Sequence, residues 1–404
     1  LKFIYIVFYT RSCFVMYAGV VEGFYGPVWN WNDRFSLMKF IGKNGLNTYI
    51  YAPKNDPYHR NLWRIQYPDE ILNRFATMIE IGKKHGVETV FALSPGLDID
   101  YYSEKDFNIL ISKLDALMAV GFRNLAIFFD DIPHPTKDQE ISSLAKAQSF
   151  LVNKVFKKLK PEKLIVCPTY YHGFYVNYLQ VIGKMLDPEI DIMWTGRWVC
   201  SFRITDDDLD IVNKFLCRKP FVWDNYPVND YFTVRDIIRL HLGPIQNRSP
   251  NLVNTVSGYT VNPANQVECS KIVLYTVAKM VKARLFYDPE KAWKEAVTLL
   301  INRNARSWFK SFAEFNKASF MNLREKVIVK KNADEVLEML KNIKETLSNR
   351  KLLKEIKPVI NKMETIARYA KGEKVSLNPH IQTAGEYRPP IPKKKMLNQM
   401  FGTI

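Results

Sequence analysis

From residue 16 onward, the sequence alternates short runs of apolar, β-branched or aromatic residues with longer segments of helical periodicity. This alternation is typical of repeated strand–helix units around a parallel sheet. Eight runs are predicted strands, at residues 17–21, 48–52, 89–93, 125–129, 164–167, 190–194, 221–223 and 256–261. Between them lie helical segments such as residues 34–43, 70–84, 104–120, 139–158 and 207–216. Eight such units in about 265 residues predict an α/β fold, a (β/α)8 or TIM barrel over residues 16–282.

The strand signals stop after about residue 282, and only helical periodicity continues. Asp288-Pro289 has the form of a helix start, and further helices are expected at residues 305–323, 332–349 and 352–369. This pattern predicts a C-terminal all-helical domain over residues 283–375. Residues 376–404, rich in proline and lysine, predict an irregular basic tail.

Residues 1–15 are apolar, but Arg11 interrupts them and no small-residue cleavage site follows. We interpret them as an N-terminal extension; if they act as a signal peptide, the protein is secreted. No run of about 20 apolar residues occurs elsewhere, so no membrane span is predicted.

Composition narrows the class of protein. With 47% hydrophobic residues, a chain of 404 residues can bury a large core. Its five cysteines are odd in number, widely spaced and without CxxC spacing, so neither a disulfide framework nor a zinc site is indicated. We therefore expect a reducing, cytoplasmic compartment.

The formal net charge of +17 raises a nucleic-acid or basic polymer-binding alternative. Lysines and arginines, however, are spread through helical segments among Asp and Glu, and no RNP-like, zinc-finger or helix-turn-helix signature is found. A solvated basic surface without a nucleic-acid partner is the favoured interpretation.

In a TIM barrel, chemistry takes place where strands end and the following loops begin. Here those positions are polar and aromatic, and the set suits a sugar pocket. They are Glu22-Gly23-Phe24-Tyr25-Gly26, Pro53-Lys54-Asn55-Asp56, Asp130-Asp131, Thr169-Tyr170-Tyr171, Thr195-Gly196-Arg197-Trp198, Asp224-Asn225 with Asn229-Asp230, and Asn262-Pro263.

Asp130 and Asp131 directly follow the apolar strand at residues 125–129. Neighbouring side chains of a strand point to opposite faces, so both acids enter one pocket only if the pleat ends there. Two adjacent carboxylates resist double ionisation, which leaves one protonated as a general acid beside an anionic partner. Taken alone, the pair is equally compatible with a metal site or a helix cap.

Other candidate clusters favour structural interpretations. Asp206-Asp207-Asp208 resembles a metal cluster, but after Thr205 and before a helical run it predicts an N-terminal helix cap. The six histidines show neither HExxH nor nucleophile-triad spacing, which disfavours metalloprotease and serine-hydrolase functions. No metal and no cofactor are expected.

Seven ordered stretches together closely resemble glycoside hydrolase family 84, whose members are O-GlcNAcases and bacterial β-N-acetylglucosaminidases. They are GVVEGFYG (residues 19–26), YIYAPKNDPYHR (49–60), FDDI (129–132), CPTYY (167–171), MWTG (193–196), WDN followed by ND (223–225 and 229–230) and VNPANQVECSKI (261–272).

The resemblance implies a retaining exo-β-N-acetylglucosaminidase that uses substrate-assisted catalysis. Asp130 would orient and polarise the 2-acetamido group, whose carbonyl oxygen is the nucleophile, and Asp131 would be the general acid and then base. The intermediate would be an oxazoline, as in the exceptions to the two-carboxylate scheme.

The resemblance also implies a binding set for the sugar. Gly23 would pass its backbone close to the ring, Tyr171 would donate to the developing oxazoline, and Trp223 would wall the acetamido methyl group. Hydroxyl and acetamido contacts would come from Lys54, Asn225, Asp230 and Asn262.

The implied partner is a glycoprotein or oligosaccharide bearing terminal β-linked GlcNAc. Three positions differ from eukaryotic members: Tyr170, Arg197-Trp198 and Pro227-Val228. We expect these at the rim of the pocket, where they would affect aglycone preference. An amino-sugar-binding barrel without turnover stays open as an alternative function.

Overall fold

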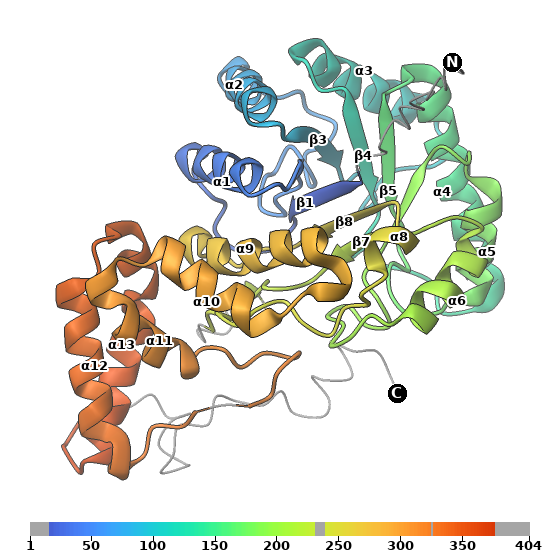
Figure 1. Cartoon of the computed structure of the whole chain (residues 1–404). Coiled ribbons are helices and arrows are strands. Elements are labelled where there is room, and N and C mark those ends of the chain that lie inside the picture. Colours follow the sequence, from blue (N-terminus) through green and yellow to red (C-terminus); the bar gives the residue numbers. More distant parts are fainter. Residues whose placement is uncertain (1–15, 231–238, 325, 376–404) are drawn as a thin grey trace, which may run out of the picture.

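The computed structural model describes residues 16–230, 239–324 and 326–375. The predictions for residues 1–15 and 376–404 lie outside these ranges. The described chain forms a barrel surrounded by helices, with the C-terminal helices standing beside it (Figure 1).

Eight parallel strands close into a barrel in sequence order, with β1 paired to β8. The strands are β1 (Tyr17–Glu22), β2 (Thr48–Tyr51), β3 (Glu88–Leu93), β4 (Asn124–Phe128), β5 (Lys163–Cys167), β6 (Asp191–Trp194), β7 (Phe221–Asp224) and β8 (Gly258–Val261). This confirms the predicted (β/α)8 fold.

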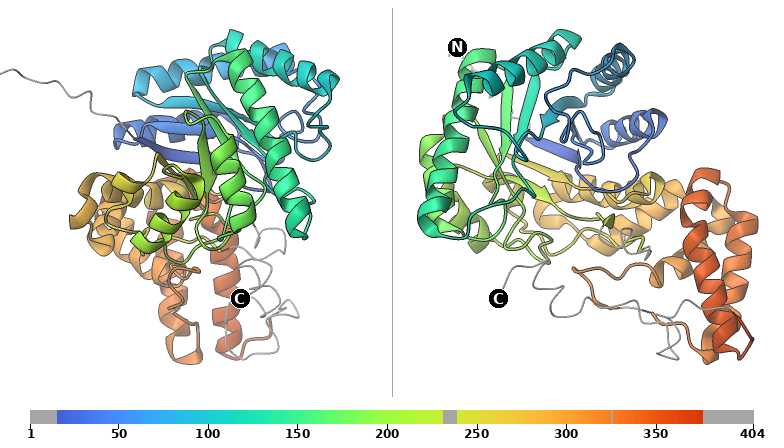
Figure 2. Two further views of the ribbon diagram at one scale, coloured as in Figure 1. Left: turned by 90° about the vertical axis from the view of Figure 1, so that its right-hand side faces the viewer. Right: turned by 180° about the vertical axis from the view of Figure 1, so that it is seen from behind.

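Helices surround the barrel and cover the outer faces of the strands (Figure 2). They are α1 (Trp31–Lys43), α2 (Asp69–His85), α3 (Glu104–Val120), α4 (Asp138–Leu159), α5 (Val176–Met185), α6 (Asp206–Leu216), the short α8 (Leu252–Thr255) and α9 (Val267–Ala283). Because both faces of each strand are covered, the strands contain almost continuous apolar runs.

Alternate strand residues divide the apolar interior into two layers. Val20, Tyr49 and Phe91 pack outward against the helices, whereas Val21 and Ile50 point into the barrel. The period of two along each strand therefore sets which side chains fill the barrel below its open end.

The acidic triplet belongs to the capped start of a helix, as predicted: it forms the first turn of α6, and Thr205 is the N-cap residue. The Thr205 hydroxyl accepts from the Asp208 N–H at 3.2 Å, and the Asp208 carboxylate accepts from the Thr205 N–H at 3.0 Å. Among the described residues, no group of three His, Cys, Asp or Glu side chains is placed to hold a metal ion.

The region after α9 is helical, as predicted. It contains α10 (Pro289–Leu300), α11 (Arg306–Glu314), α12 (Ala333–Thr346) and α13 (Arg350–Ala370), with 3-10 turns η1 (Arg284–Phe286), η2 (Arg303–Ala305) and η3 (Lys330–Asn332). These helices share one apolar core with Cys269 and Ile272 of α9. The domain boundary at residue 282 stays a prediction, and in the structure α9 ends at Ala283.

Several predicted elements were too long, including the helix expected at residues 332–349, which spans only Ala333–Thr346. In two cases the structure shows the reason. The helix expected at residues 305–323 ends at Glu314, because Asn316 bonds back to the carbonyl of Phe312 and Ser319 forms a turn with Asn322. The strand expected at 256–261 begins only at Gly258, because α8 precedes it and its last turn takes the N–H of Val256.

None of the helices in the described ranges is long and apolar enough to cross a membrane.

The C-terminal helices are attached to the barrel at the start of α9. Gln266, the N-cap residue, makes no side-chain cap hydrogen bond. Instead, the Glu355 carboxylate of α13 accepts from the N–H groups of Glu268, at 2.9 and 3.0 Å, and of Cys269, at 3.0 Å. A residue distant in sequence therefore satisfies donors that the first turn of a helix leaves open.

Burial raises the pKa of Glu355 to about 7, although the two N–H donors oppose this. The folded chain therefore keeps a proton that the unfolded chain has already released above about pH 4.5. We predict that the free energy of unfolding falls by up to about 3 kcal/mol as pH rises through this window to 7. Urea unfolding between pH 5 and 8 measures how the free energy of unfolding changes with pH. Glu355→Gln should remove this pH dependence, and Glu364→Gln, on the same helix, should keep it. Equal slopes in wild type and Glu355→Gln would contradict the assignment.

Candidate active site

A cavity of about 290 Å³ opens at the carboxyl ends of the barrel strands. All nine residues proposed from the sequence line it: Gly23, Lys54, Asp130, Asp131, Tyr171, Trp223, Asn225, Asp230 and Asn262. Tyr25, Cys167, Thr195, Val199, Cys200 and Val228 complete the lining. The fold thus brings together side chains from seven strand ends at a single pocket.

The acid pair lies where the pleat of β4 ends. Phe128 is the last strand residue, and Asp131 takes a positive φ of 52°. This left-handed conformation costs an ordinary residue roughly 1–2 kcal/mol. Because the backbone turns here, both carboxyl groups reach the cavity instead of opposite faces of the sheet, as the sequence predicted.

Asp130 is paired with Lys54 inside the pocket. Both residues are buried, and the Lys54 ammonium donates to Asp130 Oδ2. The other oxygen, Oδ1, is buried and has no partner in the described structure. A buried acceptor is costly to leave open, so this oxygen suits an N–H donor brought by a ligand.

Asp131 is held by two tyrosine hydroxyls. Tyr171 donates to Oδ1 at 2.8 Å and Tyr25 donates to Oδ2 at 2.9 Å. Burial, followed by the charge of Asp131, raises the pKa of each tyrosine, so both stay protonated donors at neutral pH. The carboxyl group is therefore fixed in orientation at the mouth of the pocket.

The histidines near the pocket do not supply a general acid. Burial lowers the pKa of His59 to about 3 and that of His172, beside Tyr171, to about 4. Both rings are neutral at pH 7 and neither lines the cavity, whereas the carboxyl groups of Asp130 and Asp131 do.

An amide network forms the floor beside the acids. Asn225 Oδ1 accepts from the Trp223 indole N–H at 2.8 Å and from Asn262 Nδ2 at 3.0 Å. Asn262 Oδ1 in turn accepts from the Gly23 N–H at 3.2 Å. The ends of β1, β7 and β8 are thereby locked together, and the indole is held on one wall.

Asp230 also lines the cavity and contacts the loop after β1. Its Oδ2 accepts from the backbone N–H of Tyr25 at 2.9 Å. The loop after β1 is further held by Asn265, whose Nδ2 donates to the Tyr25 carbonyl at 3.1 Å. Hydrogen bonds thus hold the side chains that would bind a ligand in place without the ligand.

Gly23 has no room for a side chain. A Cβ built there would lie 2.3 Å from Cζ2 and 2.5 Å from Cη2 of the Trp223 indole. The indole is also held by Asn225 and packs on Phe128 at 5.3 Å between ring centroids. Glycine is required because a neighbouring wall residue occupies the space.

We predict that Gly23→Ala lowers kcat/KM on a β-GlcNAc glycoside by about 100-fold, because the methyl group must displace the indole or the end of β1. Steady-state kinetics checks this. Gly45→Ala is the control: this glycine has a positive φ of 90° and open space around it. It should lower stability and leave kcat/KM unchanged; an active Gly23→Ala enzyme would show that the indole wall is dispensable.

Sequence reasoning missed two residues of the site. Tyr25, in the stretch at residues 19–26, bonds to Asp131. Arg60, the last residue of the stretch at 49–60, donates to the carbonyls of Asp130 and Asp131. Both lie inside quoted motifs, so the signal was present, but only the folded loops show what they contact.

The three departures from eukaryotic members have different positions. Arg197 pairs with Asp208 and Trp198 packs on Phe202, and neither lines the cavity. The hydroxyl of Tyr170 donates to the Pro135 carbonyl, away from the cavity. Val228 was expected at the rim but is buried in the lining, because the loop after β7 folds inward here.

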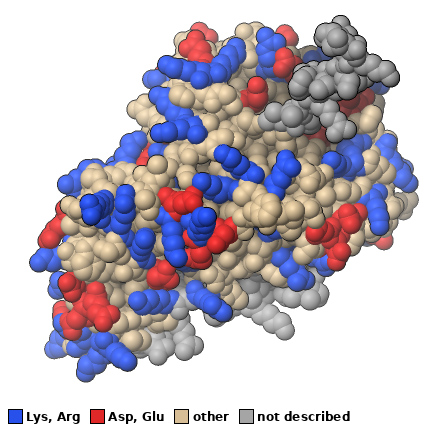
Figure 3. Space-filling view, viewed as in Figure 1, with Lys and Arg blue, Asp and Glu red and all other residues tan. Residues whose placement is uncertain are grey.

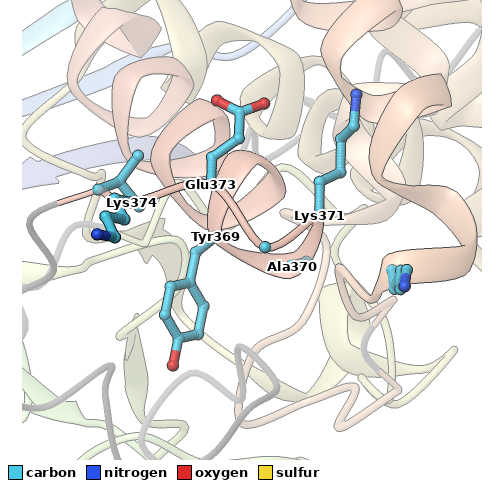
Figure 4. Close-up of a pocket in the computed structure, with 8 residues that line it drawn as sticks. Tyr369, Ala370, Lys371, Glu373 and Lys374 are labelled. Atoms are coloured by element: carbon cyan, nitrogen blue, oxygen red, sulfur yellow. The ribbon is translucent and has the colours of Figure 1, made fainter.

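A second, wider depression of about 800 Å³ lies at the end of α13, and no barrel strand contributes to its lining. Figure 4 shows that Tyr369 and Glu373 point in different directions there. Its one lining carboxylate, Glu373, pairs with Arg368 at 3.6 Å. This shallow surface has no convergent polar groups, so the barrel cavity is the candidate active site.

Comparisons with known proteins agree with this geometry. Residues 18–314 match the sequence model of the beta-N-acetylglucosaminidase (NAGidase) family. The chain is 37% identical over 279 residues to "Protein O-GlcNAcase" of Rattus norvegicus and 38% identical to that of Mus musculus. These matches span 66% of this chain and 30% of the length of each relative.

Two solved structures are similar throughout most of the chain. A mutant of the O-GlcNAc hydrolase of Thermobaculum terrenum has a TM-score of 0.79 and 33% identity, covering 89% of this chain and 83% of that one. CpGH84B has a TM-score of 0.75 and 31% identity, covering 88% and 67%. The predicted family is thereby confirmed, and the chain belongs to glycoside hydrolase family 84, the β-N-acetylglucosaminidases.

Proposed function

We propose that this chain is a retaining exo-β-N-acetylglucosaminidase that removes terminal β-linked GlcNAc from glycoproteins or oligosaccharides. The observation that carries the proposal is the adjacent pair Asp130 and Asp131, which have different partners and line one sugar-sized cavity. A cavity of about 290 Å³ with convergent polar groups suits one terminal sugar, which favours exo action.

In this proposal the acetamido group is the nucleophile. The buried, unpartnered Oδ1 of Asp130 accepts the acetamido N–H, while Lys54 keeps Oδ2 occupied. The charge of Asp130 then pushes electron density toward the carbonyl oxygen, which bonds to the anomeric carbon as the bond from that carbon to the leaving oxygen breaks. Asp130 takes the N–H proton, and the product is an oxazoline. Lys54 fixes the carboxylate before the reaction, so little reorganisation is needed.

Asp131 serves as the general acid and then the general base. Protonated, it gives its proton to the glycosidic oxygen as that bond breaks; ionised, it takes a proton from the water that opens the oxazoline. Tyr171 bonds to Asp131 and is near enough to the acetamido region to transfer its hydrogen bond to the developing oxazoline. Retention follows from two inversions at the anomeric carbon.

The remaining groups bind the sugar. Asp230, Asn225 and Asn262 present carboxylate and amide groups to hydroxyls and the acetamido group, and the Trp223 face covers the methyl group. Their mutual hydrogen bonds hold the pocket in the binding geometry before ligand entry, which reduces the entropy cost of binding.

The alternative functions have less support. A barrel that only binds amino sugar has no use for the second acid, yet two tyrosines orient Asp131 at the pocket mouth. For a basic polymer-binding protein, we would expect a face of one charge. In Figure 3, lysines and arginines on the visible face are interspersed with Asp and Glu.

We also propose the reducing cell interior as the compartment. The four cysteines in the described residues, Cys167, Cys200, Cys217 and Cys269, are all free thiols. Activity retained in millimolar reductant would agree with this location, whereas loss of activity under reduction would contradict it.

The experiment that tests the function is release of a chromophore from an aryl β-GlcNAc glycoside, followed by NMR of the first-formed sugar. We expect turnover with the β-anomer as the initial product and undiminished rates in chelator. Sugar binding without turnover would support the binding-only alternative, and the α-anomer as first product would overturn the retaining mechanism.

A further inference from the structure

We propose that Arg60 is a positioning residue for the acid pair: its guanidinium holds the backbone turn of Asp130 and Asp131, and thereby the direction in which Asp131 presents its proton. This inference rests on the proposed glycosidase function. It concerns a group that lies behind the pocket and does not line it.

The contacts of Arg60 converge on the turn. Nη2 donates to the Asp131 carbonyl at 2.7 Å, and Nη1 donates to the Asp130 carbonyl at 3.3 Å and to Ser94 Oγ at 3.1 Å. The residue is 6% exposed. A planar guanidinium with several fixed donors can hold two successive carbonyls at once, which a lysine ammonium does less well.

The turn needs such an external support. The Phe129 N–H bonds to the Cys167 carbonyl at 2.8 Å, and the strand hydrogen bonding ends there. Asp131, two residues later, has the positive φ of 52° that brings its carboxyl group beside that of Asp130. Arg60 bonds to the carbonyls on either side of this strained position, so it stabilises the conformation that aims Asp131.

Arg60 is itself held by a rigid loop between β2 and α2. Asp56 accepts from the hydroxyls of Tyr51, at 2.7 Å, and Tyr67, at 2.8 Å. Lys113 of α3 donates to the carbonyls of Tyr58, at 2.7 Å, and Ile65, at 2.6 Å. These bonds hold the loop on both sides of Arg60. The loop therefore fixes the position of the guanidinium, and the guanidinium holds the backbone turn at Asp130 and Asp131.

Arg60 and Lys54 contact the acid pair in different ways. Lys54 donates to the carboxylate of Asp130, whereas Arg60 donates to the backbone carbonyls of both Asp130 and Asp131. Arg60 therefore acts on the backbone turn and leaves the carboxyl groups themselves free of its guanidinium.

The test compares Arg60→Met with Arg60→Lys on two β-GlcNAc substrates, one with an activated aryl leaving group and one with an unactivated alkyl alcohol. Asp131 must donate a proton only for the second substrate. We expect Arg60→Met to lose at least about tenfold more kcat/KM on the alkyl glycoside than on the aryl glycoside. Arg60→Lys, which restores the charge and one donor, should recover part of that difference.

Arg64 provides the matched control. It lies on the same loop and pairs with Asp98 at 2.6 Å and Asp106 at 2.7 Å, away from the acids. Arg64→Met should lower stability while keeping the alkyl-to-aryl ratio of wild type. If Arg60→Met does not fold, the test rests on Arg60→Lys alone. A lower alkyl-to-aryl ratio of kcat/KM than in wild type would support the positioning role, and an unchanged ratio would overturn it.

Equal losses on both substrates for the Arg60 variants, with wild type active on both, would overturn the positioning role and leave the proposed function standing. A wild-type enzyme inactive on both glycosides would instead overturn the proposed function.

Discussion

Asp131→Asn should lose about 1,000-fold or more in kcat/KM on a β-GlcNAc glycoside with an alkyl alcohol leaving group, yet far less on one with an activated aryl group. General acid catalysis contributes about 10²–10⁴-fold, and only a poor leaving group needs the proton. The structure places this carboxyl group at the mouth of the cavity, held by Tyr25 and Tyr171. Steady-state kinetics on a series of leaving groups of graded acidity measures the effect.

Asp130→Asn is the matched control for this prediction. Asp130 lines the cavity and pairs with Lys54, and in the proposed mechanism it acts on the attacking acetamido group and not on the leaving oxygen. Its loss should be large on both substrates and depend little on the leaving group. A reversed pattern, with Asp130→Asn selective for poor leaving groups, would exchange the two roles.

Arg248→Met should lower the free energy of unfolding by about 3–5 kcal/mol, because it leaves a buried carboxylate without its cation. Arg248 and Asp224 are both fully buried, with Nε–Oδ2 and Nη2–Oδ1 distances of 2.5 and 2.7 Å. Asp224 ends β7 directly before Asn225, so the pair also supports the pocket floor. Urea denaturation measures the loss.

Two comparisons isolate the buried charge as the cause. Arg248→Met combined with Asp224→Asn should be less destabilised than Arg248→Met alone. Arg123→Met removes an exposed pair with Glu162 and should change stability by less than about 0.5 kcal/mol. If Arg248→Met and Arg123→Met lowered the free energy of unfolding by similar amounts, the buried pair would stabilise the fold no more than the exposed pair does.

Much of the fold could be predicted because each strand is buried on both sides. That burial requires uninterrupted apolar runs, and eight of them can be read from the sequence with ends that differ from the structure by at most two residues. The extended helix expected at 305–323 was wrong because its period continued past residues whose side chains bond to the backbone instead. The Asn316 side chain donates to the Phe312 carbonyl and the Ser319 hydroxyl accepts from the Met321 N–H, and periodicity does not reveal these contacts.

The candidate site was predictable to the extent that it follows strand ends. Asp130 and Asp131 follow β4 after one intervening residue, and Asn225 and Asn262 come directly after β7 and β8. Tyr25 and Arg60 lie three and nine residues past their strands, where loop conformation decides what a side chain reaches. Val228 illustrates the same limit, since only the inward fold of its loop makes it part of the lining.

The central claim is that the acetamido oxygen of the substrate is the nucleophile and that Asp130 polarises it. The most direct measurement is the turnover rate of wild type on aryl glycosides whose acetyl group carries zero, one, two or three fluorines. Each fluorine withdraws electron density from the attacking oxygen, so we expect kcat/KM to fall progressively, by orders of magnitude across the series, and Asp130→Ala to show a weaker dependence. Rates indifferent to fluorine, together with covalent labelling of Asp130 by a 2-fluoro glycoside, would show instead that the carboxylate is the nucleophile.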